Sequence, residues 1–565
     1  MEKESLNQLK KQLWEVADEL RANTGLKASA YSTPVLGLIF LKFADAKYAQ
    51  YEDEIKQEFE ALKGGRREKK IEEIAIEKCG FYLPEHACYT YLLNLSEEEN
   101  IASKIKEAME GIERYSPEFV DVLPKDSYHD LSTEDNNKIL NRLLRNFNDI
   151  PVDTEHDIFG EVYEYFLGEF ALAEGQGGGE FYTPRSVVRY MVEVLQPSEG
   201  KILDPACGSG GMFVQVASYA QAHKEKNGGT PLNLRAYGVE RTGETVKLAK
   251  MNLFLNNIRG EITEANSYYA DPYNSVGNFD YVLANPPFNV DNVELDLVKD
   301  QERFNKYGVP QTKGKKPKVP NANYLWINQF ATALNENGRA SLVMANSASD
   351  AGHSEKEIRK ALIEDGIVSQ MVALPSNMFS TVTLPATLWF FDRNKPKKDE
   401  ILFIDARNIF TQVDRALRKF SDEQIKNLAI INRLYEGDSD SFFALIKEYE
   451  EARDQAEIEA DEKYYQKQID WLLERFPEGK YQDVIGLCKV ATLEGEDGII
   501  DQDYSLNPGR YVGVVIEDDG MTAEQFKEEL YSLNEEFKQL NEEAKELEKE
   551  IEENLDSLVI EYERV

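Results

Sequence analysis

The sequence has few cysteines and no long apolar run, and these two absences exclude several classes of protein. Its cysteines are Cys79, Cys88, Cys207 and Cys488. Their spacing fits neither a disulfide framework nor a paired zinc site, so we expect no metal centre. The apolar run Val35–Phe40 is too short to span a bilayer, and the first residues do not resemble a signal peptide. We therefore expect a cytoplasmic protein without membrane contact.

Positive charge is also scarce. The chain has 65 lysine and arginine residues against 103 aspartate and glutamate residues, a net charge of -38. Proteins that hold nucleic acid through its phosphates usually present a basic surface, so the composition disfavours tight, independent binding to DNA. Two basic runs are exceptions, Lys63–Lys70 and Lys313–Lys318. The second lies in the polar segment 289–323, which is either a loop that closes over a nucleotide or a solvated loop.

The length of 565 residues predicts two or three domains. Residues 1–150 have a helical pattern, and the first helix is amphipathic through Leu6, Leu9, Leu13, Val16 and Leu20. Residues 151–420 alternate strands with helices, which predicts an α/β, Rossmann-like sheet with helices on both faces. Residues 421–520 are helical and irregular. Residues 521–565 form a last helix.

This last helix has the pattern of a coiled coil. Thr522 and Gln525 form a capping box, and Met521 and Phe526 form a hydrophobic staple. Apolar residues then alternate spacings of four and three, namely Phe526, Leu530, Leu533, Phe537, Leu540, Ala544, Leu547 and Ile551. Several such heptads predict a contact with a partner helix, and the alternative is a helix packed on its own domain.

The most informative stretch is Asn285-Pro286-Pro287-Phe288, which follows the apolar run Phe279–Ala284. The amine of an amide or a nucleobase is a weak nucleophile because its lone pair is delocalised. The side-chain oxygen of Asn285 and the rigid carbonyl of Pro286 could accept hydrogen bonds from that amine and expose the lone pair. Phe288 would stack on the flat base. The alternative is a strand that ends in an ordinary proline turn.

A segment upstream predicts a binding site for a methyl donor. Residues 201–213 form a short strand, a glycine-rich turn and the start of a helix near Met212. The residues assigned to this turn are Asp204, Ala206, Gly208, Ser209, Gly210 and Gly211. Glycines let backbone N–H groups approach a ligand, and Asp204 is expected to fix the turn by hydrogen bonds.

A second strand, Leu234–Val239, ends in Glu240 and precedes a helix over residues 242–256. An acidic residue in this position can accept hydrogen bonds from ribose hydroxyls. Asp204, Glu240 and Asn285 all fall at carboxyl ends of predicted strands, which is where open α/β sheets bind ligands.

A third element precedes the donor turn. Gly177–Arg185 leads into a helix over residues 186–195, with Thr183 as the predicted N-cap and Pro184 as the first helical residue. The N–H groups of a helix N-terminus attract anions, so this end could hold a carboxylate. An ordinary capped helix is the alternative.

Together these motifs resemble the S-adenosylmethionine-dependent amino-methyltransferases of DNA, and more narrowly the modification subunit of type I restriction-modification systems. The resemblance covers most of the chain and also includes Glu161–Phe166, Asn323–Trp326, Ala373–Ser376, Met378-Phe379 and Leu506–Tyr511. It implies that Ser209–Gly211 contact the donor backbone, Glu240 the ribose and Asn266 the donor adenine. It also implies contact with the methionine end by Glu180, Phe181, Tyr182, Thr183, Pro184 and Arg185. Asn285–Phe288 would hold a flipped base.

The implied reaction is direct transfer of a methyl group to the exocyclic amine of adenine. Cytosine-ring methyltransferases use a cysteine nucleophile, but Cys207 lies inside the donor turn and is expected to be a packed residue. Two other hypotheses stay open: methylation of a protein glutamine or an RNA base, and an inactive assembly scaffold. The intact residues of the predicted site disfavour the scaffold.

The resemblance also implies partners. Double-stranded DNA with a flipped adenine would be the substrate. In this family a separate DNA-specificity subunit offers long helices and joins two modification subunits, and a restriction nuclease subunit can be present. The heptads after residue 521 are the candidate contact for the specificity subunit.

Overall fold

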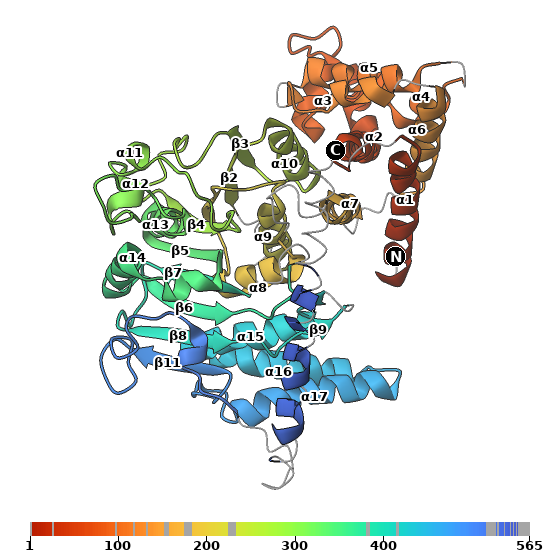
Figure 1. The fold of residues 1–565 in the computed structure, drawn as a ribbon. Coiled ribbons are helices and arrows are strands. Elements are labelled where there is room, and N and C mark those ends of the chain that lie inside the picture. The colour runs from red at the N-terminus through yellow and green to blue at the C-terminus, as the bar shows by residue number, and fades with distance from the viewer. Residues whose placement is uncertain are drawn as a thin grey trace, which may run out of the picture. The chain divides into compact units, whose positions relative to one another are not determined.

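The structure is a computed structural model of the chain (Figure 1). It describes residues 3–24, 28–96, 99–116, 119–131, 134–151, 158–174, 183–223, 233–379, 385–413, 417–515, 527, 530–535, 537–542, 544–545, 547–549 and 551. The chain forms two compact units, Met1–Gly513 and Val514–Val565. The finer division predicted at residues 150 and 420 stays a prediction.

The N-terminal part is helical, as its pattern predicts. Its helices are α1 (Lys3–Thr24), α2 (Ala28–Leu62), α3 (Ile71–Cys79), α4 (Tyr89–Leu93), α5 (Ile101–Tyr115), α6 (Glu134–Phe147) and α7 (Ile158–Glu174), with short 3-10 turns at Glu85–Ala87 and Lys125–Leu131. Leu13 of α1 is buried, and Leu9 and Val16 pack against the same apolar core. The predicted amphipathic face of the first helix therefore points inward at these positions.

A nine-stranded sheet follows (Figure 1). Its strands are β1 (Gly200–Asp204), β2 (Leu234–Glu240), β3 (Gly260–Glu264), β4 (Phe279–Ala284), β5 (Leu334–Ala345), β6 (Val368–Ala373), β7 (Ala386–Asp392), β8 (Glu400–Asp405) and β11 (Cys488–Thr492). They lie in the order β11-β8-β6-β7-β5-β4-β1-β2-β3. The strands from β1 to β5 pair in parallel, and β7 runs antiparallel between β5 and β6. A separate hairpin joins β9 (Thr411–Gln412) to β10 (Arg418–Lys419).

Helices cover both faces of the sheet. They are α8 (Arg185–Leu195), α9 (Gly211–Ala222), α10 (Gly243–Leu255), α11 (Leu295–Val298), α12 (Glu302–Asn305), α13 (Asn323–Ala333), α14 (His353–Glu364), α15 (Asp422–Tyr435), α16 (Ser439–Asp454) and α17 (Glu459–Arg475). Strand β4 shows the two faces: Leu283 packs in the core with α8, α9, α10 and α15, while Val282 and Ala284 pack in the core with α13 and α14. This alternation is that of a strand buried on both sides.

Helix α10 joins the N-terminal helices to the sheet. Ala249 and Leu253 pack in the core of the sheet, whereas Met251 and Leu255 belong to the N-terminal core. Phe254 on the same helix contacts an N-terminal ring, Phe119, at a centroid distance of 4.5 Å. The helix that follows the predicted ribose-binding residue is therefore fixed from two sides.

The predicted α/β class, with a helical region before the sheet, is confirmed. Among the described residues no helix combines the length and apolar character that a membrane span requires. The predicted capping box and staple at Met521, Thr522, Gln525 and Phe526 lie outside the described residues.

Candidate active site

The glycine-rich turn between β1 and α9 is held by buried hydrogen bonds. Asp204, the last residue of β1, is 1% exposed, and its Oδ1 accepts a hydrogen bond from Ala206 N–H at 3.0 Å. Ser267 Oγ donates to the carbonyl of Pro205 at 2.5 Å. Asp204 therefore has the turn-fixing contact that the sequence predicts, and Ser267 adds a second one.

The turn leaves open space where a ligand could approach it. Gly208 and Gly210 have φ values of +51° and +84°, a region that favours glycine. A Cβ added at Gly208 or at Gly211 would meet no heavy atom within 4 Å. Gly211 itself is the first residue of α9. This open glycine surface fits a donor molecule lying against the backbone.

Glu240, the last residue of β2, holds the glycine-rich turn by hydrogen bonds. Its Oε2 accepts a hydrogen bond from Gly208 N–H at 3.1 Å, and its Oε1 accepts one from Thr242 N–H at 2.9 Å. Each carboxylate oxygen keeps a further lone pair, so these contacts leave capacity for ribose hydroxyls. Glu240 thus has a structural role that its motif alone does not indicate.

Asn266 lies beside Glu240, because Ala265 N–H donates to the carbonyl of Glu240 at 2.9 Å. The side-chain Oδ1 of Asn266 accepts a hydrogen bond from Tyr268 N–H at 3.1 Å. The carboxyl ends of β2 and β3 therefore meet, and they bring together the residues that the resemblance assigns to the ribose and to the donor adenine.

Arg303 in α12 fixes the segment that follows Asn266. Its side chain is 3% exposed and donates to the carbonyls of Ser267 (2.7 Å), Tyr268 (3.2 Å) and Ala270 (3.0 Å). Burial lowers the pKa of Arg303 to about 10, so the guanidinium stays charged at neutral pH. The buried guanidinium therefore holds the backbone of residues 267–270 in place through hydrogen bonds to its carbonyl oxygens.

The Asn285–Phe288 motif directly follows β4, which pairs in parallel with β1. Leu203 pairs with Val282, so the donor turn and Asn285 extend from neighbouring strands about 4.8 Å apart. The strand order reverses between β1 and β4. After β1 the chain adds β2 and β3 on one side of that strand, and it then adds β4 on the other side. The gap between β1 and β4 is therefore the topological switch point, where open α/β sheets bind ligands. Pro286 is buried, and Phe288 packs against both cores.

Two asparagines fix the turn after Phe288. Asn289 N–H donates to Asn323 Oδ1 at 2.8 Å, and Asn323 Nδ2 donates to Asn289 Oδ1 at 2.9 Å. Asn323 is 3% exposed and begins α13. The motif Asn323–Trp326 therefore contributes to the geometry of the predicted base-binding turn.

Burial changes the acid-base behaviour of the donor turn. It raises the pKa of Asp204 to about 8, and the nearby Glu240 carboxylate adds to this shift. Burial, with the charges of Asp204 and Glu240, also raises the pKa of the Cys207 thiol well above its usual value. Since the thiolate is the reactive form and Cys207 is buried, it is a packed residue, as predicted.

The start of α8 differs from its prediction. The predicted N-cap Thr183 is wrong, because Pro184 with ψ of 131° occupies the N-cap and helical residues begin at Arg185. Pro184, the N-cap residue, supplies no side-chain hydrogen bond to the first N–H groups. The predicted donor contacts Glu180, Phe181 and Tyr182 lie outside the described residues.

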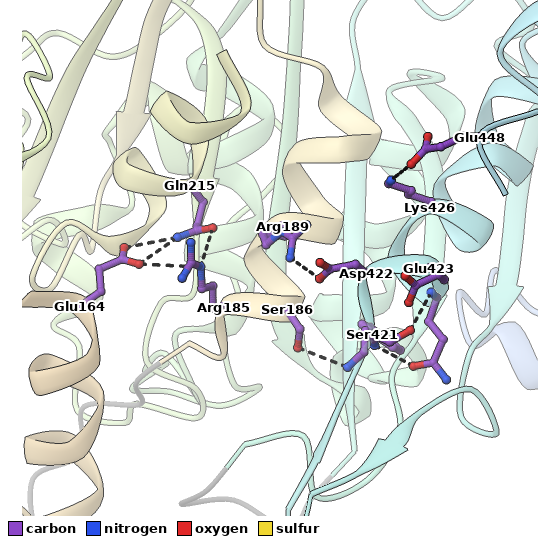
Figure 2. A network of polar contacts seen from close by, with 12 residues as sticks. Glu164, Arg185, Ser186, Arg189, Gln215, Ser421, Asp422, Glu423, Lys426 and Glu448 are labelled. Atoms are coloured by element: carbon purple, nitrogen blue, oxygen red, sulfur yellow. Dashed lines mark hydrogen bonds and ion pairs between the residues drawn. The ribbon is translucent and has the colours of Figure 1, made fainter. Parts of the chain in front are cut away.

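Arg185 belongs to a polar network that joins three helices (Figure 2). Its Nε donates to Gln215 Oε1 of α9 at 3.3 Å and lies 3.9 Å from Glu164 Oε2 of α7. Gln215, which is 3% exposed, donates to Glu164 at 3.1 Å. The helix that begins at Arg185 is thereby tied to the helix that follows the donor turn.

Sequence reasoning missed the roles of Arg303 and Ser267, which no motif marks. It also missed Asn252 of α10, whose Nδ2 donates to the carbonyl of Ser209 at 2.9 Å. Asn252 is fully buried, and its one signal in the sequence is that it is a polar residue among the apolar residues of a helix. Such a signal does not identify the partner.

Comparison with known proteins decides the family. A family model described as N-6 DNA Methylase matches residues 154–471, and one described as HsdM N-terminal domain matches residues 9–147. The chain belongs to the N-6 DNA methylase family. It is therefore an S-adenosylmethionine-dependent methyltransferase that acts on the N6 amine of adenine in DNA, as the sequence predicts.

The relatives narrow this assignment to the methylase subunits of type I restriction enzymes. The MjaIX methylase subunit of Methanocaldococcus jannaschii is 35% identical over 92% of this chain and 88% of its own length. The HindI methylase subunit of Haemophilus influenzae is 36% identical over 72% of this chain and 79% of its own. A type I methyltransferase subunit from Streptococcus thermophilus has the same fold, with a TM-score of 0.69 and 21% identity over 90% of this chain and 100% of its own.

The contacts of Arg303 predict a role in donor binding. Arg303→Met should weaken binding of S-adenosylmethionine at least about tenfold, because three carbonyls lose a charged donor and the segment after Asn266 is released. Arg303→Lys should restore part of the affinity. Isothermal titration with S-adenosylmethionine measures this directly.

Arg235→Met is the matched control, since Arg235 is an exposed residue of β2 that pairs with Glu261 at the surface. Its affinity for the donor should equal that of the wild type. An Arg303→Met protein with unchanged donor affinity and an unchanged melting temperature would contradict the assigned role.

Proposed function

We propose that Asn285 Oδ1 and the carbonyl of Pro286 accept hydrogen bonds from the N6 amine of an adenine extruded from duplex DNA, while Phe288 stacks on its ring. The parallel pairing of β1 with β4 supports this proposal, because the glycine-rich turn and Asn285 extend from neighbouring strands. Two acceptors at one amine draw its lone pair out of conjugation. Proline at 286 and 287 limits the movement of the turn.

The donor site is proposed from the contacts around the glycine turn. S-adenosylmethionine supplies a methyl group that is already activated on its sulfonium. The backbone of Ser209–Gly211 would lie against the donor, the remaining lone pairs of Glu240 would accept from the ribose, and Asn266 would lie near the donor adenine. The N-terminus of α8, whose N-cap residue Pro184 has no capping side chain, would with residues 180–185 attract the methionine carboxylate.

The protein's contribution to the rate is proposed to be orientation and exclusion of water. Direct transfer needs the amine and the donor methyl in line, which a rigid edge of the sheet can provide. Asp204 is buried, bound to Ala206 N–H and lies below the turn, so it acts as a positioning residue. No step requires Cys207.

Recognition of the DNA sequence is proposed to come from a separate specificity subunit, with two copies of this chain joining one such subunit in the cytoplasm. The described apolar residues of the predicted coiled-coil seam are exposed, at 55–64% for Leu530, Leu533, Phe537, Leu540, Leu547 and Ile551. A row of exposed leucines at heptad spacing fits a partner helix. A restriction nuclease subunit could join the same complex.

The role of Asn285 predicts a specific kinetic defect. Asn285→Ala should lower the rate of methyl transfer by at least about 100-fold, because one of two acceptors for the amine is lost, while donor affinity changes less than about twofold. Transfer of labelled methyl groups to DNA and titration with S-adenosylmethionine measure the two effects.

Asn94→Ala is the control, since Asn94 is an exposed asparagine at the end of α4 whose Nδ2 donates to the carbonyl of Thr90 in the same helix. That variant should keep full activity. Methylation by Asn285→Ala at the normal rate would remove Asn285 from the proposed site.

The exposed seam predicts how the complex assembles. Replacing Leu533 and Leu540 together by Asp should release the specificity subunit during size-exclusion chromatography, because charges would enter the helix interface. Changing the exposed flanking residues Glu535 and Lys538 to Gln should leave the complex intact. The chain alone should bind DNA weakly, and tight binding by the chain alone, or assembly by the Asp variant, would contradict this proposal.

A further inference from the structure

A stretch of the chain without a single acidic residue follows both halves of the site in the sequence. From Arg303 to Asn335 there is no aspartate or glutamate, although the whole chain carries a net charge of -38. The stretch contains five lysines, four of which gather in the short segment Lys313–Lys318. This stretch is therefore positively charged within an acidic protein.

This segment is a closed loop with a fixed base. Thr312 N–H donates to the carbonyl of Lys318 at 2.9 Å, and Lys318 N–H donates to Thr312 Oγ1 at 3.1 Å. Pro310 and Val319 on either side are buried, while Lys313, Lys315, Lys316 and Lys318 are exposed. The buried flanks therefore hold the loop in place and present its lysines to solvent.

The base of the loop lies at the edge of the sheet that carries Asn285. Ala322 N–H donates to the carbonyl of Val290 at 2.8 Å, two residues beyond Phe288. On the other side, Gln311 N–H donates to Ser354 Oγ at 3.0 Å, and Ser354 lies in α14 shortly after the carboxyl end of β5, the neighbour of β4. Ala322 follows Lys318 by four positions, a separation of at most about 14 Å, so the loop stays near the turn.

Two lysines of the other basic run are held by acidic neighbours, whereas its Arg66, Arg67 and Lys70 make no ion pair with described residues. Lys63 pairs with Glu60 at 3.1 Å and Lys69 pairs with Glu77 at 2.6 Å. Within the described part of the chain, Lys313, Lys315, Lys316 and Lys318 make no ion pair. Their positive charge is therefore available to a ligand from outside the chain.

We propose that the Lys313–Lys318 loop binds the phosphodiester backbone of the DNA strand that carries the extruded adenine. Extruding a base costs unstacking energy and moves the backbone on either side of it, so cations placed beside the base-binding turn stabilise the displaced strand. Four local charges also offset the repulsion between DNA and an acidic chain at the point of contact. This inference rests on the proposed base-binding role of Asn285–Phe288.

The test uses the complex assembled with the specificity subunit and a duplex carrying the site that is methylated in the host's DNA. In the loop variant Lys313, Lys315, Lys316 and Lys318 all become Gln. In the control variant Lys63, Arg66, Lys69 and Lys70 become Gln, which removes the same charge from the other basic run. Affinity for the duplex is measured between 50 and 200 mM salt, conditions in which phosphate contacts dominate the salt dependence.

The slope of log K against log salt should fall by about 2 to 3 in the loop variant, since each lost phosphate contact removes about 0.9. The control variant should keep the wild-type slope. Two smaller variants, the single change Lys315→Gln and the double change Lys315→Gln/Lys316→Gln, should lower the slope in steps. They test the proposal even if the fourfold variant folds poorly. Donor affinity should not change.

Three outcomes would overturn the proposal. Equal slopes for loop and control variants would make the loop a solvated surface. Loss of the specificity subunit from the loop variant would make it a protein contact, and loss of donor affinity would place it in the donor site. Failure of the wild-type complex to methylate the duplex would instead contradict the base-binding role, so the two failures are distinguishable.

Discussion

The site depends on one constraint, the parallel pairing of β1 with β4. Leu203 pairs with Val282, so two segments far apart in the sequence leave the sheet side by side at its switch point. The turn after β1 carries the open glycine surface, and the turn after β4 carries Asn285 and Phe288. In the proposed site the donor and the amine meet because these two turns share an edge. The remaining contacts keep the turns in place.

Those contacts form a shell of buried polar groups around the edge. Glu240 holds the donor turn, Arg303 holds the segment after Asn266, and Asn323 holds the turn after Phe288. Each joins elements that are distant in sequence, and each is nine-tenths buried or more. Rigidity of this kind suits a reaction in which alignment of the two reactants determines the rate.

Much of this could be predicted from the sequence, because its strongest signals are local. An apolar run that ends in an acidic residue or in Asn-Pro-Pro-Phe predicts a strand and places its last residue at the carboxyl edge of the sheet. Asp204, Glu240 and Asn285 lie at that edge, as their patterns predict. Arg303, Ser267 and Asn252 could not be found, since their roles follow from partners across the fold. The start of α8 was misplaced because Pro184 fits the N-cap as well as the first helical turn. The contacts assigned to Glu180, Phe181 and Tyr182 stay predictions.

We infer that this edge of the sheet methylates the N6 amine of adenine at a DNA sequence that another subunit recognises. The most direct measurement is to incubate duplex DNA with isotopically labelled S-adenosylmethionine and either the complex or this chain alone, then to digest the DNA and identify the labelled nucleoside by mass spectrometry. We expect labelled N6-methyladenine at one defined sequence with the complex, and little label with the chain alone. Label on the cytosine amine, or equal labelling by the chain alone, would contradict it.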